Sequence, residues 1–304
     1  MRVAAIDCGT NSIRLLVADL VDDRLIDVSR RMEIVRLGEG VDRTGRLASE
    51  AIERTRRALL GYAAEIAELG IADVRMVATS ASRDAANAAD FRAMVRAVLG
   101  VDPEVITGDE EARLSFTGAV RGLTAEPPYL VVDIGGGSTE FVTGGTTSEQ
   151  AISMDIGCVR MTERHLRSDP PTAEEITAAE RDITAAVDTA LAAVPGREAR
   201  TLLGLAGSVT TVTALALGLP AYDPSRIHHT AVTYDQVAKI TADLLAATVA
   251  ERRALPVMHP GRADVIGAGA LILRTIMERS GQPEVVASEH DILDGIAWSL
   301  APAR

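Results

Sequence analysis

The sequence predicts an α/β protein made of two similar domains, each built on a mixed β-sheet. One observation is that the same order of residue types occurs twice, as VAAIDCGTNS at 3–12 and as LVVDIGGGSTE at 130–140. A second is that strand-like and helix-like segments alternate after each of these motifs. Third, 304 residues with 47% hydrophobic content suit two separate cores. We expect domains at 1–124 and 125–288 with a cleft between them, and a helix within 289–304 that packs back on the first.

The first half begins as a meander of strands. Strand patterns at 3–8, 13–20 and 25–31, with a turn at Asp22-Asp23, predict three antiparallel strands. Helical spacing over 48–69 follows, with Ser49 as the expected N-cap and Gly70 as the expected stop. The remaining expected elements are strands at 74–78 and 104–106 and helices at 90–99 and 110–120.

The second half opens after Glu126-Pro127-Pro128 and repeats this beginning. A strand-turn-strand unit starts at Tyr129, and Thr172 is the expected cap of a helix over 173–194. A strand at 202–206 ends in Gly207-Ser208-Val209-Thr210-Thr211, which should start a helix. Further elements are expected as helices at 234–247, 250–254, 263–280 and 292–300 and as a strand at 285–287.

Composition excludes several classes of protein. No apolar run is long enough for a membrane span, and the two isolated cysteines, Cys8 and Cys158, fit a reducing compartment, so we expect a cytoplasmic protein without a membrane partner. A net charge of −12 argues against nonspecific nucleic-acid binding. Lys239 is the single lysine, which excludes a Walker A loop. The five histidines show no metal-binding spacing, and no Gly-x-Ser-x-Gly elbow is present.

The two repeated motifs predict phosphate binding. In each, an apolar strand ends in Asp and then turns through Gly and hydroxyl residues, which presents backbone N–H groups to an anion beside a carboxylate that can hold a metal. Two such turns predict that one phosphate chain is held from both sides.

Five segments together resemble the exopolyphosphatase and guanosine pentaphosphate phosphohydrolase (Ppx/GppA) family, within the actin-like (ribonuclease H-like, ASKHA) superfamily. They are DCGTNSIRL at 7–15, TSASRDA at 79–85, GDEEARL at 108–114, DIGGGSTE at 133–140 and GLAGSVTT at 204–211. Each pattern alone is weak, but all five in this order are specific to the family. The resemblance implies two actin-like domains.

The resemblance also implies the catalytic and metal-binding residues. Glu111 corresponds to the base that takes a proton from the attacking water, a task that suits a carboxylate in phosphoanhydride hydrolysis. Asp133 and Glu140 resemble the family's divalent-cation ligands, for Mg²⁺ or Mn²⁺, because the turn between them returns Glu140 beside Asp133. Asp7 could approach the same ion from the other turn.

The remaining expected site residues contact phosphate. They are Thr10, Asn11, Ser12, Arg14, Arg83, Gly136, Gly137, Ser138, Thr139, Gly207 and Ser208. Arginine suits this task because its planar fork bridges two oxygens. For Arg14, strand alternation leaves open a position in solvent. The small residues at 267–270 could equally serve close helix packing.

The implied activity is Mg²⁺-dependent removal of the terminal phosphate from inorganic polyphosphate. Longer relatives continue beyond the length of this chain, so we expect a preference for short polyphosphates. Dimerisation is common in the family, so the resemblance also implies a homodimer. The alternative within the family is hydrolysis of the 5′ phosphate of guanosine pentaphosphate (pppGpp). Two other classes rank lower: a kinase of the superfamily, because the segment with Glu111 favours water as acceptor, and a non-catalytic alarmone or polyphosphate sensor, because the catalytic set is intact.

Overall fold

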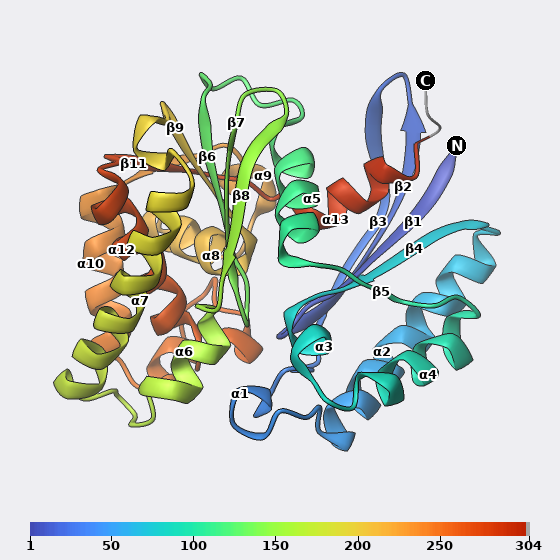
Figure 1. The fold of residues 1–304 in the computed structure, drawn as a ribbon, viewed down its shortest axis with the longest axis horizontal. Coiled ribbons are helices and arrows are strands. Elements are labelled where there is room, and N and C mark those ends of the chain that lie inside the picture. Colours follow the sequence, from blue (N-terminus) through green and yellow to red (C-terminus); the bar gives the residue numbers. More distant parts are fainter. Residues whose placement is uncertain (302–304) are drawn as a thin grey trace. The chain divides into compact units, whose positions relative to one another are not determined.

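The computed structural model describes residues 1–301, which fall into two compact units. One unit contains residues 1–118 together with 292–301, and the other contains Ala119–Asp291. The chain therefore returns to its first unit after completing the second (Figure 1).

The first unit is built on a five-stranded mixed sheet with the order β3-β2-β1-β4-β5. Its strands are β1 (Arg2–Cys8), β2 (Ser12–Val21), β3 (Arg24–Ile34), β4 (Asp73–Ala78) and β5 (Glu104–Val105). The pairs β1–β2 and β2–β3 are antiparallel, whereas β4 pairs in parallel with both β1 and β5. The predicted antiparallel meander is confirmed.

Helices cover both faces of this sheet (Figure 1). Apolar residues of α2 (Ser49–Glu68) and α4 (Ala88–Leu99) form one core with the face that carries Ile6 and Leu15. The opposite face packs against α13 (Ile292–Ser299). The unit also contains α1 (Val41–Thr44), α3 (Ser80–Asp84) and most of α5 (Gly108–Val120).

The long helix α2 differs from its prediction at one end. Ser49 lies inside the helix and Ala48 occupies the N-cap without a side-chain hydrogen bond, so the prediction of Ser49 as cap is wrong. Helical hydrogen bonds already begin at the Ala48 carbonyl, which accepts from the N–H groups of Ala51 and Ile52, so the helix starts one residue earlier than a serine cap would place it. At the other end, Gly70 follows the helix with a φ of 64°, as expected of a glycine stop.

The second unit repeats the same sheet and adds a strand. Its order is β10-β11-β9-β6-β7-β8, so the run from β8 to β11 matches the run from β3 to β5. The strands are β6 (Tyr129–Ile134), β7 (Thr139–Gly144), β8 (Ser148–Met154), β9 (Thr201–Leu205), β10 (Ala231–Thr233) and β11 (Glu284–Ala287). Here too the first three strands are antiparallel and the next pair in parallel. The predicted α/β class with two similar mixed sheets is confirmed.

The helices of the second unit pack around α12 (Ile266–Ser280), which is buried along most of its length. Its partners are α6 (Cys158–His165), α7 (Ala173–Ala193), α8 (Ala206–Ala216) and α10 (Tyr234–Ala246). Shorter elements are α9 (Pro224–Ile227), α11 (Val249–Arg253) and two 3₁₀ turns at Gly196–Glu198 and Pro260–Arg262. Thr172 caps α7 in a capping box with Glu175, as its prediction required. Across residues 1–301, no helix combines the length and apolar character needed to cross a bilayer.

Candidate active site

The first phosphate-binding candidate is the turn between β1 and β2. Gly9 closes it by donating its N–H to the carbonyl of Ser12 at 2.9 Å. The carbonyls of Thr10 and Asn11 accept hydrogen bonds of 2.9–3.1 Å from N–H groups within 35–38, just after β3. Because N–H and C=O point in opposite directions in a trans peptide, the N–H groups of Asn11 and Ser12 are directed away from that segment. The backbone can therefore present them to an anion.

A partly buried ion pair joins the two strands that flank this turn. Asp7 and Arg14 are opposite each other in the β1–β2 register, and Asp7 Oδ2 accepts from Arg14 Nη2 at 2.7 Å and from Nε at 3.0 Å. Arg14 lies in a partly buried position and not in open solvent, with 20% of its side chain exposed. Its charge is opposed by Asp7, so the metal-binding role of Asp7 and the phosphate contact of Arg14 both stay predictions.

Helix α3 joins the first turn to Glu111. Thr10 Oγ1 and Ser80 Oγ share a buried hydrogen bond of 2.9 Å. Three residues further on, Arg83 donates through Nη1 to the carbonyl of Ile106 at 2.9 Å and to Glu111 Oε2 at 3.3 Å. Glu111 is only 8% exposed and lies in the first turn of α5. Residues predicted from three separate motifs thus meet at the carboxyl ends of β1, β4 and β5.

The second candidate is the glycine turn between β6 and β7. The carbonyls of Gly135, Gly136 and Gly137 accept 2.7–3.1 Å hydrogen bonds from the backbone of 158–160 and from the Arg160 guanidinium. The trans peptide geometry then directs the N–H groups of Gly136, Gly137 and Ser138 to the other side. Three successive N–H groups form the kind of concave site that binds phosphate.

Close packing fixes the position of this glycine turn. A Cβ on Gly157 would lie 2.3 Å from the backbone carbonyl of Gly136, so the start of α6 can approach the turn only with glycine there. The hydroxyl of Thr139 donates to the carbonyl of Ile156, and the Ser138 side chain is 2% exposed. The Thr139 hydroxyl therefore stabilises the turn, the Ser138 side chain is buried, and the backbone is the part that can face a phosphate.

Two buried carboxylates face each other beside the glycine turn. Asp133 and Glu140 are direct cross-strand partners and are 7% and 1% exposed. Glu140 Oε1 accepts from Ser153 Oγ at 2.8 Å. Within residues 1–301, no group of three or more His, Cys, Asp or Glu side chains is arranged to hold a metal ion. The pair fits Mg²⁺, which binds proteins through one or two carboxylates and fills its octahedron with water and phosphate oxygens.

A third turn leads from β9 into α8. The Arg262 guanidinium lies flat on Gly207, where a Cβ would come within 2.0 Å of Nη2, and Nη1 donates to the Gly207 carbonyl at 3.0 Å. Ala206 has a φ of 65°, which is unusual for a residue with a side chain. The Ser208 side chain is buried against Gly269. The small residues at 267–270 thus serve helix packing. Because the Ser208 side chain is buried, only the backbone of Ser208 stays a candidate for phosphate binding.

Two cations at these turns were not predicted from the sequence. Arg160 contacts Gly137 and Arg262 contacts Gly207, and both lie outside the five motifs. Each reaches its glycine from a separate segment, so only the tertiary structure brings the partners together. The thiols of Cys8 and Cys158 are buried, and burial raises the pKa of each, which leaves neither suited to act as a nucleophile.

Comparison with known proteins identifies the family. A model of the Ppx/GppA phosphatase family matches residues 16–303. A Mycobacterium tuberculosis protein named Exopolyphosphatase 2 is 52% identical over 314 aligned positions, which cover 99% of this chain and 98% of the relative. The crystal structure of an exopolyphosphatase-like protein superposes with a TM-score of 0.95 at 44% identity over 98% of each chain. An Aquifex aeolicus PPX-GPPA enzyme gives a TM-score of 0.83 at 34% identity, covering 98% of this chain and 99% of its own. This chain belongs to the Ppx/GppA phosphatase family.

Proposed function

We propose that this protein is an exopolyphosphatase that removes the terminal phosphate of inorganic polyphosphate with the help of Mg²⁺ or Mn²⁺. The observation that carries the proposal is the buried Asp133–Glu140 pair beside the glycine turn, whose carbonyls are all bound on one side, so that its peptide N–H groups point to the other. Such a surface suits a metal-bound phosphate chain. The 52% identity to a protein named Exopolyphosphatase 2 supports polyphosphate as the substrate.

Glu111 is the residue we assign to activate water. Its carboxylate, held by Arg83, takes a proton as the water oxygen attacks the terminal phosphorus. The bond from that phosphorus to the bridging oxygen breaks, inorganic phosphate forms, and the shortened chain leaves with the electron pair on its new terminal oxygen. A metal held by Asp133 and Glu140 would neutralise charge on the phosphate oxygens. In each unit, the N–H groups of its turn could hold a phosphate.

The proposal extends to substrate range and assembly. We assign short polyphosphates as preferred substrates and keep pppGpp hydrolysis as the alternative, because both present the same terminal phosphoanhydride. The assignment includes a homodimer, which light scattering coupled to gel filtration can test. It also includes a cytoplasmic location, which the two buried free thiols, Cys8 and Cys158, support.

A phosphate-release assay tests the activity and the role of Glu111 together. Short polyphosphate, long polyphosphate, pppGpp and ATP are compared at equal concentrations of terminal phosphate with Mg²⁺ present. We expect fastest release from short polyphosphate, and a loss of about 10²–10⁴-fold in kcat for Glu111→Gln. If only pppGpp were hydrolysed, the assignment of polyphosphate as substrate would be wrong and pppGpp would take its place.

Asp109→Asn is the matched control for Glu111→Gln. Asp109 lies on the same first turn of α5, but its side chain is 58% exposed and pairs with Arg113 of the same helix. The control should keep wild-type kcat. If Glu111→Gln did so as well while remaining folded, the water-activating role would be wrong even if the substrate were right.

A further inference from the structure

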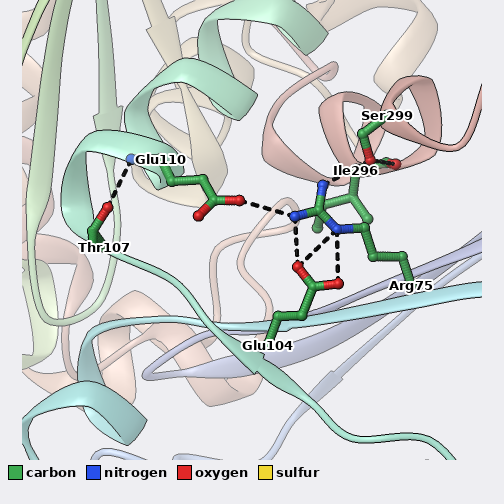
Figure 2. A network of polar contacts seen from close by, with 6 residues as sticks. All are labelled: Arg75, Glu104, Thr107, Glu110, Ile296 and Ser299. Carbon is green, nitrogen blue, oxygen red and sulfur yellow. Dashed lines mark hydrogen bonds and ion pairs between the residues drawn. The ribbon is translucent and has the colours of Figure 1, made fainter. Parts of the chain in front are cut away.

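A four-element polar network surrounds Arg75, a residue outside all five motifs. Arg75 lies on β4, opposite Ala5 in the parallel β1–β4 register, and its side chain is only 16% exposed. Figure 2 shows its guanidinium between Glu104 of β5, Glu110 of α5 and Ser299 of α13. One side chain therefore contacts three other elements of the first unit.

All three guanidinium nitrogens donate hydrogen bonds. Nε and Nη2 grip Glu104 at 2.7–3.2 Å, Nη2 also donates to Glu110 Oε1 at 2.9 Å, and Nη1 donates to Ser299 Oγ at 2.7 Å. Ser299 in turn donates to the carbonyl of Ile296 at 2.6 Å. Isolated exposed ion pairs contribute little, but a planar cation with fixed acceptors on three elements constrains their relative orientation.

Glu110 connects this network to the site, because it immediately precedes Glu111. Successive helical residues point about 100° apart, so the two carboxylates leave α5 in different directions. Arg75 holds one and Arg83 holds the other, at 2.9 and 3.3 Å. Thr107 adds a backbone anchor, since it accepts from the N–H groups of Glu110 and Glu111 at 3.2 and 2.9 Å (Figure 2 draws the first).

We propose that Arg75 is a positioning residue for Glu111, acting through Glu110 to set the rotation of the first turn of α5. The inference rests on the proposed role of Glu111. Arg75 and Arg83 bind the same helical turn from different directions. If the turn rotated about the helix axis or moved along it, at least one of these charge-assisted hydrogen bonds would be lost. Catalysis by a base depends on such placement, and a misplacement of about 1 Å can cost about 10²-fold in rate.

The test separates rate from binding. Arg75→Ala and Glu110→Ala should each lower kcat on polyphosphate by about 10-fold to 100-fold, with KM within about twofold of wild type. Glu110→Gln keeps an amide oxygen as acceptor for Arg75 Nη2 and should restore most of kcat. In the double variant Arg75→Ala/Glu110→Ala, the loss should equal that of one single variant, because both changes break the same contact.

Arg113→Ala is the matched control. Arg113 is on the same helix and also pairs with a carboxylate, Asp109 at 2.9 Å, but this pair ties α5 to no other element. Its kcat should stay at the wild-type value. All assays are run well below the unfolding temperature of each variant, so that loss of folded protein is not counted as loss of rate.

The outcomes distinguish the two proposals. No phosphate release from polyphosphate by wild type would remove the proposed function itself. An active wild type with an inactive Glu111→Gln, but with Arg75→Ala at full kcat, would overturn only the positioning role. Additive losses in the double variant, or no restoration by Glu110→Gln, would also overturn it, because either result would mean that the loss of kcat does not pass through the Arg75–Glu110 contact.

Discussion

The turns at Asp7 and Asp133 share one backbone design but carry opposite charge arrangements. In both, a glycine N–H closes the turn on a serine carbonyl, Gly9 on Ser12 and Gly135 on Ser138. In both, the carbonyls of the turn are bound by the segment that follows the third strand of the sheet. In both, the Asp faces the residue seven positions later across the strands, which is Arg14 in one unit and Glu140 in the other.

The residue opposite the Asp is therefore the main chemical difference between the two turns. Arg14 neutralises Asp7 within the protein, whereas Glu140 adds a second buried carboxylate beside Asp133. Like charges at directly opposed cross-strand positions are destabilising, so the proposed metal ion would stabilise the second turn more than the first. Phosphate holding and metal binding would then be divided between the two copies of the fold.

The largest expected effect comes from making the second turn resemble the first. Glu140→Arg should place a cation beside Asp133, remove the metal site and lower kcat by about 10³-fold or more, since a metal contributes several kcal/mol of charge stabilisation. Wild type should show a rise in Tm on addition of Mg²⁺, and Glu140→Arg should show none. The measurements are phosphate release and thermal unfolding with and without the ion.

The reciprocal change in the first turn is the control for that result. Arg14→Glu creates a carboxylate pair with Asp7, which should destabilise the protein without Mg²⁺ while leaving the Asp133–Glu140 pair in place. A Mg²⁺-dependent rise in Tm should therefore persist in this variant. If Glu140→Arg still gained stability from Mg²⁺, the ion would bind elsewhere and the comparison would fail.

An intermediate effect is expected from adding a methyl group behind each turn. A Cβ at Gly157 meets the backbone of Gly136 at 2.3 Å, whereas a Cβ at Gly38 meets Thr10 Cγ2 at 2.3 Å. Backbone cannot move aside without distorting the N–H cradle, so Gly157→Ala should cost about 1–3 kcal/mol of stability and lower kcat. Gly38→Ala should cost less, as measured by urea unfolding and steady-state kinetics.

A second substitution sharpens this contrast. Thr10→Ser removes the clashing methyl group and keeps the hydroxyl that bonds Ser80, so it should recover stability in the Gly38→Ala background. No side-chain change offers the same relief at Gly157. If Gly157→Ala and Gly38→Ala lowered the free energy of unfolding equally, the two turns would be held by equally rigid packing, contrary to this expectation.

The smallest expected effect is a response to mild acid confined to the second unit, which contains all five histidines. Burial lowers the pKa of His229, with a contribution from His290, and its buried Nε2 has no hydrogen-bond partner among residues 1–301. Burial also lowers the pKa of His259, with a contribution from Arg262. Below about pH 6.5 these two histidines bind protons more readily in the unfolded chain than in the folded one. The free energy of unfolding should therefore fall as pH falls.

His229→Asn checks this assignment. Asn tolerates the φ of 62° at this position, and the variant should lose less stability than wild type between pH 7.5 and pH 5.5. Hydrogen exchange should show the acid-induced loss of protection in the second unit first. An equal loss in the first unit, which has no histidine, would contradict the assignment.

The sequence predicted the parts of the site that depend on local chain geometry. Both turns, and the return of Glu140 beside Asp133, follow from a strand that ends in Asp and reverses direction, and the register confirms that return. Arg160 and Arg262 could not be found this way, because each reaches a glycine through tertiary packing. The N-cap of α2 was also missed, because helical hydrogen bonding begins at the Ala48 carbonyl, one residue before the serine that local capping preference favours.

The last helix, α13, has a consequence for the order in which the chain can fold. It covers the sheet face that carries Val3, Ala5, Leu16 and Val77, all made at least 200 residues earlier in synthesis. The second unit is one continuous stretch of chain, so all the segments of its core are made in one run. The first unit is discontinuous, so its apolar face stays uncovered until α13 has been made, and an exposed apolar surface in a folding intermediate favours aggregation.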